Sequence, residues 1–404
     1  MQRFFGNLRF STRYIVLAVL MAGVVFAMVL VYVQGRVEKV SQKEQGAKPA
    51  ITPAAKTPIE PQLAPSEVLS GLSHPWDVVF LPDRTLLFNE RGGQVSKLVD
   101  GKKVVIADIA DVYAVGEGGL TGLALDAKFA ANRYLYTCFN AQTASGLDVR
   151  LVRWKLSEDA TSLTDRKDIV VGIPSNRSGR HSGCRVRSDA QGDLWVGTGD
   201  AAVASNPQSP SNLGGKILHV TRDGMPAGGN LPAPFDPRIF SYGHRNVQGL
   251  VLFNEPQDGV YGYSVEHGTD RDDEINLLKS GNFGWAPRVT YVESGIPMTD
   301  LTRFPDAISA IWSSGNPTIA PSGATLLKGE KWGTWTGAVA MAVLKGKHLR
   351  IMRFDESYKL IEEKVVLGDY GRIRSAAIDT DQDLYITTDN GSNDKIIKVT
   401  PTGN

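Results

Sequence analysis

The stretch DAQGDLWVGTGD, Asp189–Asp200, joins a polar turn to a short apolar strand that ends in Thr, Gly and an acidic residue. With this stretch included, the pattern occurs six times, centred near Leu86, Tyr134, Leu194, Val260, Ala338 and Leu384, and the copy near Ala338 is looser than the others. Six strand-rich repeats of roughly 40–70 residues are typical of propellers, in which each repeat forms one blade. We therefore predict an all-β fold, a six-bladed β-propeller with four-stranded blades. A pair of β-sandwiches or a different solenoid is the alternative.

The segments between the copies contain turn signals rather than helical periods. LVDGKKVV, Leu98–Val105, and VTRDGMP, Val220–Pro226, have the turn chemistry of hairpins. Glycine is abundant, at 42 residues, which also indicates many turns. The formal net charge of +1 gives no reason to expect a nucleic-acid partner.

The N-terminus differs in kind from the rest of the chain. Tyr14–Val33 is free of charge and long enough to cross a bilayer core of roughly 30 Å as a helix. Arg3, Arg9 and Arg13 precede it, so residues 1–13 are expected in the cytoplasm and the remainder outside. We predict a transmembrane anchor. A cleaved signal peptide, which would make the protein secreted, is the alternative.

Residues 34–65 are polar and rich in Lys, Gln, Ala and Pro, which predicts a flexible linker. The propeller domain is accordingly expected over residues 66–404, on the periplasmic or other extracytoplasmic side. An exported protein could pair Cys138 with Cys184, but the sequence does not show whether they meet.

His181 and Asp200 flank the strand pattern quoted first. Histidine is the natural general base near neutral pH, and it needs an orienting partner. Asp200, at the end of the second strand of the predicted hairpin, could be that partner. A solvent-facing loop histidine is the simpler interpretation of the local sequence.

SYGHRNVQGL, Ser241–Leu250, concentrates polar side chains in the turn before a strand. Arg245 offers a planar fork of donors suited to a carboxylate or a quinone oxygen. A buried structural arginine paired with an acid is the alternative.

Two further segments indicate bound ions. EHGTDRDDEIN, Glu266–Asn276, holds five carboxylates in eleven residues, and a hard cation such as calcium would neutralise them. Arg372 and Arg374 are two residues apart, which on a strand places both on one face and suggests a bound anion. Lys345 could join them. Solvated acidic and basic surfaces are the alternatives.

Together these segments resemble one known family. From Leu72 to the C-terminus the chain is similar to the soluble glucose dehydrogenases and aldose sugar dehydrogenases, six-bladed propellers that use pyrroloquinoline quinone (PQQ) and calcium. The segments that carry the resemblance, in family order, are HPWDVVFLPDRTLLFNERGG, GEGGLTGLALDAKF, HSGCRV…LWVGTGD, GKILHVTRDG, YGHRNVQGL, EHGTDRDDEINLLKSGNFGWAP, APSGATLL and GRIRSAAI…DLYITTDN.

The resemblance implies a catalytic role for three residues. His181 would be the general base that takes the proton of the sugar C1 hydroxyl while hydride passes from C1 to C5 of PQQ. Asp200 would orient the histidine. Arg245 would stabilise the charge that builds on the C5 oxygen.

The resemblance also assigns the ligand-binding residues. Arg245 and Asn246 would contact the quinone oxygens, and Lys345, Arg372 and Arg374 would hold the three PQQ carboxylates. Backbone carbonyls of Gly268 and Thr269 would bind the calcium that is linked to PQQ. A second calcium would be bound by Glu274 and the carbonyl of Phe283.

Three positions depart from the family pattern. Glu117 stands where the family has Gln, near the quinone and sugar, and a carboxylate there opposes an anionic cofactor. Cys184 replaces a glycine and adds bulk close to the base. Thr269 replaces a proline, which leaves the carbonyl ligand in a less rigid loop.

The implied function is PQQ-dependent oxidation of an aldose at its anomeric carbon to a lactone. The electrons would pass to an unidentified acceptor, with a membrane quinone or a cytochrome as candidates. The alternatives are a non-catalytic propeller that binds a glycan or a protein, which Glu117 and Cys184 would favour, and a calcium-dependent lactonase. A lactonase would leave the cationic residues unexplained.

Overall fold

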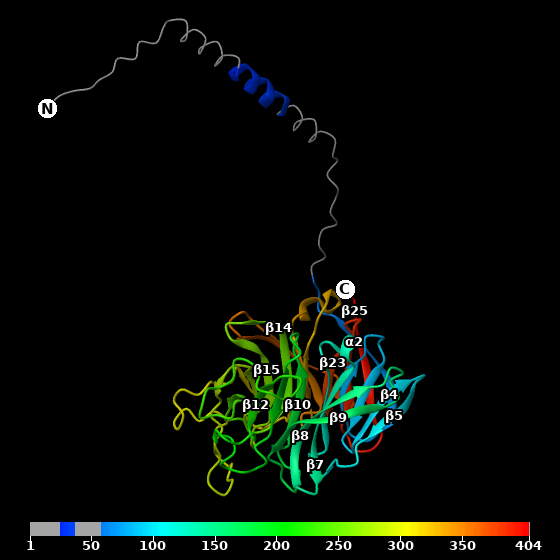
Figure 1. Cartoon of the computed structure of the whole chain (residues 1–404), viewed down its shortest axis with the longest axis vertical. Coiled ribbons are helices and arrows are strands. Elements are labelled where there is room, and N and C mark those ends of the chain that lie inside the picture. The colour runs from blue at the N-terminus through cyan, green and yellow to red at the C-terminus, as the bar shows by residue number, and fades with distance from the viewer. Residues whose placement is uncertain (1–24, 37–57, 404) are drawn as a thin grey trace, which may run out of the picture. The chain divides into compact units, whose positions relative to one another are not determined.

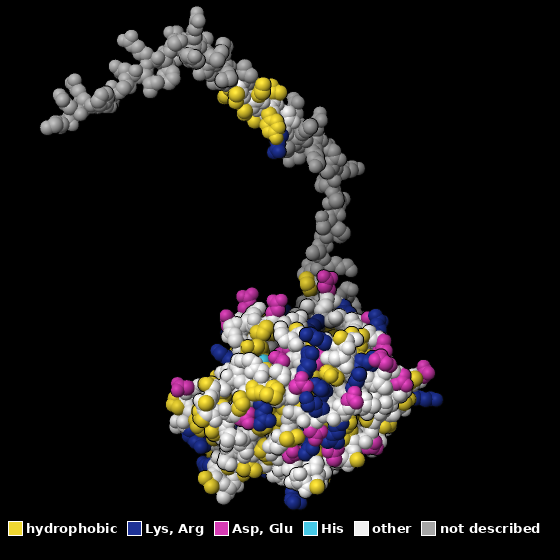
Figure 2. Space-filling view, viewed as in Figure 1, with side chains coloured by type: hydrophobic (Ala, Val, Ile, Leu, Met, Phe, Trp, Pro, Cys, Tyr) yellow, Lys and Arg dark blue, Asp and Glu magenta, His cyan; other side chains and the backbone are white. Residues whose placement is uncertain are grey.

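The computed structural model describes residues 25–36 and 58–403 (Figure 1). Contacts divide the chain into two units, Met1–Thr57 and Pro58–Asn404. In the first unit, residues 25–36 form a helix whose apolar side chains are exposed (Figure 2). None of the helices within the described residues is long and apolar enough to cross a membrane. Residues 14–24 of the expected span lie outside the described residues, so the anchor stays a prediction.

The second unit is built from six sheets, which we number as blades 1 to 6 (Figure 1). Blades 1 and 2 comprise β2 (Pro75–Phe80), β3 (Leu86–Glu90), β4 (Gln94–Val99), β5 (Lys102–Asp108), then β6 (Leu120–Leu125), β7 (Tyr134–Thr143), β8 (Gly146–Leu156), β9 (Leu163–Ile173). Blades 3 and 4 comprise β10 (Gly183–Ser188), β11 (Leu194–Thr198), β12 (Lys216–Val220), β13 (Ile239–Tyr242), β17 (Gly281–Asn282), then β14 (Val247–Gln257), β15 (Val260–Glu266), β16 (Glu274–Leu277), β18 (Trp312–Ser313). Blades 5 and 6 comprise β19 (Pro321–Leu326), β20 (Val339–Val343), β21 (His348–Phe354), β22 (Leu360–Val366), then β23 (Ile373–Ile378), β24 (Leu384–Thr388), β25 (Asp394–Thr402), β1 (Gln62–Leu72).

The all-β fold of six blades is confirmed, and five of the six sheets have the expected four strands. Blade 3 has five, because the short β17 pairs in parallel with β13. Helical structure in this unit is limited to short segments, namely α2 (Phe129–Asn132) and the 3-10 turns η1 (Glu330–Trp335) and η2 (Gly368–Tyr370).

The six sequence repeats correspond to the same strand in every blade. Their centres fall in or just before β3, β7, β11, β15, β20 and β24, and each of these is the second strand of its sheet. The repeat is visible because this strand is flanked by turns on one side and by small or polar residues on the other.

The core lies between neighbouring blades rather than within one sheet. Tyr136 and Leu151 of blade 2 pack in one cluster with Val186, Val196 and Leu218 of blade 3, and all five side chains are fully buried. Each blade therefore gains stability from its neighbours, as expected for a repeat architecture.

Blade 6 is completed by the beginning of the described unit. β1 pairs antiparallel with β25, from Gln62 opposite Thr402 to Leu72 opposite Asp394. The strand begins at Gln62 rather than at Ser66, so the end of the expected linker is part of a blade. This pairing joins the two ends of the propeller unit and leaves no gap between blades 6 and 1.

Strand direction brings the candidate residues to one end of the propeller. The first and second strands of a blade are antiparallel, so residues just before the first strand lie beside residues just after the second. His181 and Arg245 precede first strands, whereas Asp200, Gly268 and Lys345 follow second strands. The turns between the two strands lie at the opposite end.

Candidate active site

His181 and Asp200 form a buried pair at the entrance to blade 3. His181 has φ 54°, a left-handed backbone conformation that turns the chain into β10. Its Nδ1 lies 2.8 Å from Oδ1 of Asp200, and the two side chains are 3% and 0% exposed. The predicted partnership between the two residues is therefore present in the structure.

Two aromatic side chains hold the other oxygen of Asp200. The Trp285 indole N–H donates to Asp200 Oδ2 at 2.8 Å, and the Tyr291 hydroxyl donates to the same oxygen at 2.6 Å. Burial, and next the negative charge of Asp200, raise the pKa of Tyr291, so its hydroxyl stays protonated. The Tyr291 oxygen also lies 2.9 Å from His181 Nδ1. With two acceptors facing Nδ1, the proton of the neutral imidazole belongs on that nitrogen and Nε2 carries the lone pair.

An arginine–glutamate–arginine bridge lies over the imidazole. Arg180 donates from Nε to His181 Nε2 at 3.3 Å, and its terminal nitrogen pairs with Glu293 at 2.8 Å. The other oxygen of Glu293 pairs with Arg245 at 2.9 Å. Arg180 is 46% exposed whereas Arg245 is 6% exposed. The side chain of Arg180 therefore separates His181 Nε2 from solvent, and its exposure leaves it free to adopt another rotamer.

Asn246 and Glu117 meet on the inner side of this bridge. The Asn246 amide donates to Glu117 Oε2 at 2.9 Å, and its oxygen accepts from the backbone of Gly183 at 3.1 Å. Burial raises the pKa of Glu117, but the neighbouring His181 and His267 and the Asn246 amide outweigh it and lower the pKa overall. Glu117 is therefore an ionised acceptor within the site.

A cavity of about 300 Å³ adjoins Glu117 and is rich in arginine. Its lining includes His74, Arg91, Glu117, Arg372, Arg374 and Asp389. The cavity is at the lower limit of ordinary ligand sites, which start near 300 Å³. It brings together the two arginines that the sequence predicted to face one anion.

The two arginines differ in how firmly they are held. Arg374 pairs with Asp389 and lies over the Trp76 ring, 3.8 Å from its centroid. Arg372 donates to the backbone carbonyl of Asp389 at 3.0 Å and keeps 40% of its side chain exposed. Arg372 is consequently the more available of the two for an anionic ligand.

Lys345 lies at the same end of the propeller but outside this cavity's lining. It is exposed in the loop between β20 and β21, whose neighbouring backbone N–H groups donate to Ala320 and Ile319. Among the residues that the structure describes, its ammonium makes no side-chain contact. Its predicted role in cofactor binding stays a prediction.

The loop that carries Gly268 and Thr269 is fastened by Asp273. Asp273 accepts from the Gly268 N–H at 2.9 Å and from the Thr318 hydroxyl at 2.6 Å. The preceding carbonyl, that of His267, accepts from Arg245 at 3.2 Å. The two predicted carbonyl ligands are therefore next to Arg245, in a loop of fixed shape.

His267 has an unsatisfied nitrogen at the centre of this group. Its Nε2 is buried and has no hydrogen-bond partner among the described residues. Burial lowers its pKa, and the charges of Asp273 and Glu117, which act in the opposite direction, do not outweigh burial together with Arg245 and Arg374. An orphaned polar atom among charged side chains is what an absent polar ligand would leave.

Glu274 belongs to a separate buried cluster. Burial, and next the neighbouring Glu266, raise its pKa well above the ordinary value. Asn276 donates to both carboxylates, at 3.2 Å to Glu274 and 2.8 Å to Glu266. Phe283 joins the cluster by stacking on His244, the histidine that holds Glu266. The raised pKa means that Glu274 favours its protonated form unless a positive charge lies close to it.

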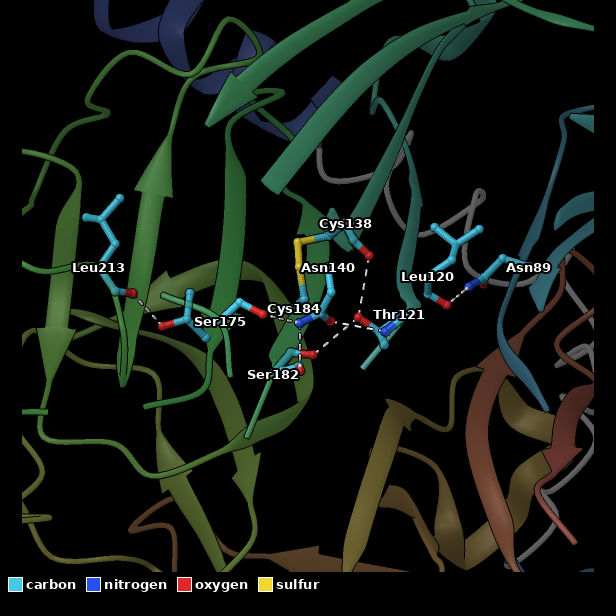
Figure 3. Close-up of a disulfide and its surroundings, with 12 residues drawn as sticks. Asn89, Leu120, Thr121, Cys138, Asn140, Ser175, Ser182, Cys184 and Leu213 are labelled. Atoms are coloured by element: carbon cyan, nitrogen blue, oxygen red, sulfur yellow. Dashed lines mark hydrogen bonds between the residues drawn. A yellow bond between two sulfur atoms is a disulfide. The ribbon is translucent and has the colours of Figure 1, made fainter. Parts of the chain in front are cut away.

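Cys184 lies at the interface between blades 2 and 3. It forms a disulfide with Cys138, so that β10 of blade 3 is linked covalently to β7 of blade 2 (Figure 3). Gly122 makes room for it, because a Cβ there would lie 2.8 Å from the Cβ of Cys138. The side chain of Cys184 is therefore part of a cross-link between blades 2 and 3, three residues after His181. Its left-handed φ of 72° directs the side chain into the interface between blades.

Five side chains that hold His181, Asp200 or Arg245, or lie beside them, escaped sequence reasoning: Trp285, Tyr291, Glu293, Arg180 and His267. Tyr291 and Glu293 lie in the irregular segment between β17 and β18, where no repeat or period fixes their position. Arg180 and His267 stand beside residues that were predicted, and adjacency to His181 and Gly268 was the available signal.

The fold and the position of these residues define a propeller protein with a polar, ligand-sized site at one end. The sequence profile of the glucose/sorbosone dehydrogenase family matches residues 72–398. The chain therefore belongs to the glucose/sorbosone dehydrogenase family.

Individual relatives agree with this assignment. The aldose sugar dehydrogenase YliI of Escherichia coli is 30% identical over 83% of this chain and 92% of its own. The structure of a soluble aldose sugar dehydrogenase from Escherichia coli, in the apo-form, matches with a TM-score of 0.76 at 27% identity, covering 84% of this chain and 100% of that one. The PQQ-bound aldose sugar dehydrogenase of Streptomyces coelicolor matches with a TM-score of 0.70 at 29% identity, covering 86% and 100%.

Proposed function

We propose that the protein oxidises an aldose at the anomeric carbon to a lactone, with PQQ as the hydride acceptor. The proposal rests mainly on the contacts that the two ring nitrogens of His181 make. Its Nδ1 is held by Asp200 at 2.8 Å, while Nε2 faces a half-exposed Arg180. The family supports the reaction class, and the PQQ-bound relative from Streptomyces coelicolor supports the cofactor.

The residues of the chain would move the proton. The substrate hydroxyl would replace the Arg180 N–H at His181 Nε2, and this nitrogen would take the hydroxyl proton as the hydride leaves the same carbon. Asp200 would stabilise the resulting imidazolium through Nδ1. Tyr291 and Trp285 would keep Asp200 in place, because they occupy the oxygen that the histidine does not use.

The cationic side chains fit the cofactor. PQQ, when bound, supplies the carbonyl that accepts the hydride, and its three carboxylates require positive charge. Arg91, Arg372 and Arg374 line the adjoining cavity. Arg245 and Asn246 would face the quinone oxygens, since Arg245 is buried near the unsatisfied His267. Lys345 would reach the cofactor from its exposed loop.

The acidic residues fit calcium. The carbonyls of Gly268 and Thr269 would hold an ion next to the cofactor, and Glu274 with the Phe283 carbonyl would hold a second one. The raised pKa of Glu274 supports the second site, because a cation there would remove the need for a proton.

Neither alternative function gains support from a specific contact. A lactonase requires acidic and amide side chains that converge on a central metal. Glu117 and Asn246 instead bond to each other, and Arg245 and Arg374 lie near them. A binding module requires no buried His–Asp pair. The Cys138–Cys184 disulfide supports an oxidising, extracytoplasmic location for the propeller unit.

Replacing His181 with Asn tests the assignment of the base. We expect His181→Asn to lower kcat for aldose oxidation by at least about 100-fold, because general base catalysis contributes roughly that much. Binding of PQQ, followed by its absorption spectrum, should change little and serves as the control for folding. Aldose oxidation at the wild-type rate in the PQQ-loaded variant would show that another group is the base.

A further inference from the structure

Three potential metal ligands lie at the opposite end of blade 3 from the active site. β10 starts beside His181 and ends at Ser188, and β11 returns to Asp200. The turn between them carries Asp189 and Asp193. His219 is on β12, opposite Trp195 in the register of the sheet. The full blade length therefore separates this group from the proposed catalytic residues.

The ligand atoms of the three residues converge. His219 Nε2 lies 3.7 Å from Asp189 Oδ2 and 4.0 Å from Asp193 Oδ2. All three ligand atoms lie within 4.8 Å of one another. Two ligands about 2.1 Å from a tetrahedral metal are roughly 3.4 Å apart, so the two distances from His219 need to contract by roughly 0.3 and 0.6 Å.

His219 is oriented as metal-binding histidines are. Its Nδ1 donates to the carbonyl of Gly228 at 2.9 Å, which places the lone pair on Nε2. Its ring is stacked on Trp195, with centroids 3.8 Å apart and planes at 17°. The residue is 5% exposed. Within the described part of the chain, Nε2 has no hydrogen-bond partner. A buried basic nitrogen thus points at two carboxylates without reaching either.

The carboxylates of Asp189 and Asp193 differ in how many hydrogen bonds hold them. Asp189 is fixed: its Oδ1 accepts from the backbone of Gln191, Gly192 and Asp193, and its Oδ2 accepts from the Trp195 indole at 3.0 Å. Asp193 makes no side-chain hydrogen bond among the described residues and is 31% exposed.

The group opens into a cavity of about 280 Å³. Its lining includes Asp189, Asp193 and His219, so water could complete the coordination of an ion. Arg222 is near enough for its charge to act on Asp193, but its guanidinium lies 3.6 Å from Asp126 of blade 2 and forms no ion pair with either acid of the turn within the described residues. The two acidic groups of the turn therefore remain available for a metal ion.

We propose that Asp189, Asp193 and His219 form a binding site for a divalent transition metal ion of the zinc, cobalt or manganese type. One imidazole nitrogen and two carboxylate oxygens favour such an ion over calcium, which takes six to eight oxygen ligands. The site fastens the β10–β11 turn to β12. It is independent of the proposed calcium sites and of PQQ.

The competing interpretation is a simple ion pair, in which His219 is protonated on both nitrogens. An ion pair needs no metal, so these three residues would then not bind Co²⁺. Titration of the full-length chain with Co²⁺, in excess calcium and without PQQ, separates the two. Cobalt bound by nitrogen and oxygen ligands absorbs visible light, and the absorption reports both stoichiometry and geometry.

We expect saturable visible absorption at one equivalent of Co²⁺, displaced by Zn²⁺. Asp193→Asn removes one ligand without breaking a hydrogen bond and should weaken the affinity at least about tenfold. His219→Gln should abolish the band. His348→Gln is the matched control, because His348 also bonds a carbonyl through Nδ1 but its Nε2 accepts from Arg350 at 3.0 Å.

Two results would overturn the proposal. One is the absence of a saturable cobalt band in the wild-type protein. The other is equal cobalt affinity in the wild type and Asp193→Asn, which would place the ion elsewhere. A band that His348→Gln removes as well would also count against the assignment.

Discussion

Glu117 places a carboxylate beside the cavity that we propose for the cofactor. Its carboxylate accepts from Asn246, and its lowered pKa keeps it ionised beside a cavity lined by Arg372 and Arg374. The carboxylate therefore neutralises part of the positive charge that an anionic cofactor would use. The arginines offset the charge of Glu117, but this carboxylate competes with an anionic ligand for the same arginines.

We expect Glu117→Gln to tighten PQQ binding about three- to tenfold, because one negative charge is removed within several ångströms of the cofactor carboxylates. Titration of the variant and the wild type with PQQ measures this. The difference should shrink as the pH falls through the lowered pKa of Glu117, since the wild-type carboxyl then becomes neutral as well.

Glu67→Gln is the matched control for net charge. Glu67 is exposed on β1, the outermost strand of blade 6, and pairs with Lys395. It is not among the residues that line the cavity. It should leave PQQ affinity unchanged. Unchanged or weaker binding in Glu117→Gln would show that the carboxylate does not oppose the cofactor.

The sequence predicted those site residues that stand at the ends of the repeated strands. His181 and Asp200 flank one hairpin, so the pattern of turn and strand was enough to bring them together. Tyr291 and Glu293 could not be predicted, because they come from a long irregular segment. Its path depends on side-chain contacts, such as the one from Tyr291 to Asp200, rather than on a period.

The elements beside the base are joined by the Cys138–Cys184 disulfide. It links β7 to β10 three residues after His181, and Thr121 bridges the carbonyls of Cys138 and Gly183 at 3.4 and 3.3 Å (Figure 3). Asn140 of β7 also donates to Ser182 at 3.0 Å. Blades 2 and 3 are therefore locked together beside the base. Two lone cysteines gave no sign of this, because their separation of 46 residues fixes neither distance nor direction.

We expect the loss of this disulfide to destabilise the propeller. Closing a loop of 46 residues is worth about 2–4 kcal/mol. In a unit of this size the double variant Cys138→Ser/Cys184→Ser should melt roughly 3–6 °C below the wild type. Differential scanning calorimetry measures the shift.

Reductant provides the control for this comparison. It should lower the melting temperature of the wild type and leave that of the double variant unchanged. Equal melting temperatures of the oxidised wild type and the double variant would show that the cross-link contributes nothing to stability.

The six blades were easier to predict from the sequence than the β1–β25 pairing that closes the ring of blades. Each blade repeats a local pattern, and its second strand recurs in sequence. The pairing of β1 with β25 joins segments more than 300 residues apart, and neither strand carries the repeat. For that reason the linker was expected to extend to residue 65, although β1 begins at Gln62.

The central claim is that the end of the propeller bearing His181 binds PQQ and oxidises an aldose with it. The most direct test is titration of the full-length chain with PQQ in the presence of calcium, followed by addition of aldoses while the cofactor spectrum is recorded. We expect saturable binding at micromolar PQQ or below, and reduction of the bound cofactor by an aldose. No binding at micromolar PQQ, or bound PQQ that no aldose reduces, would contradict it.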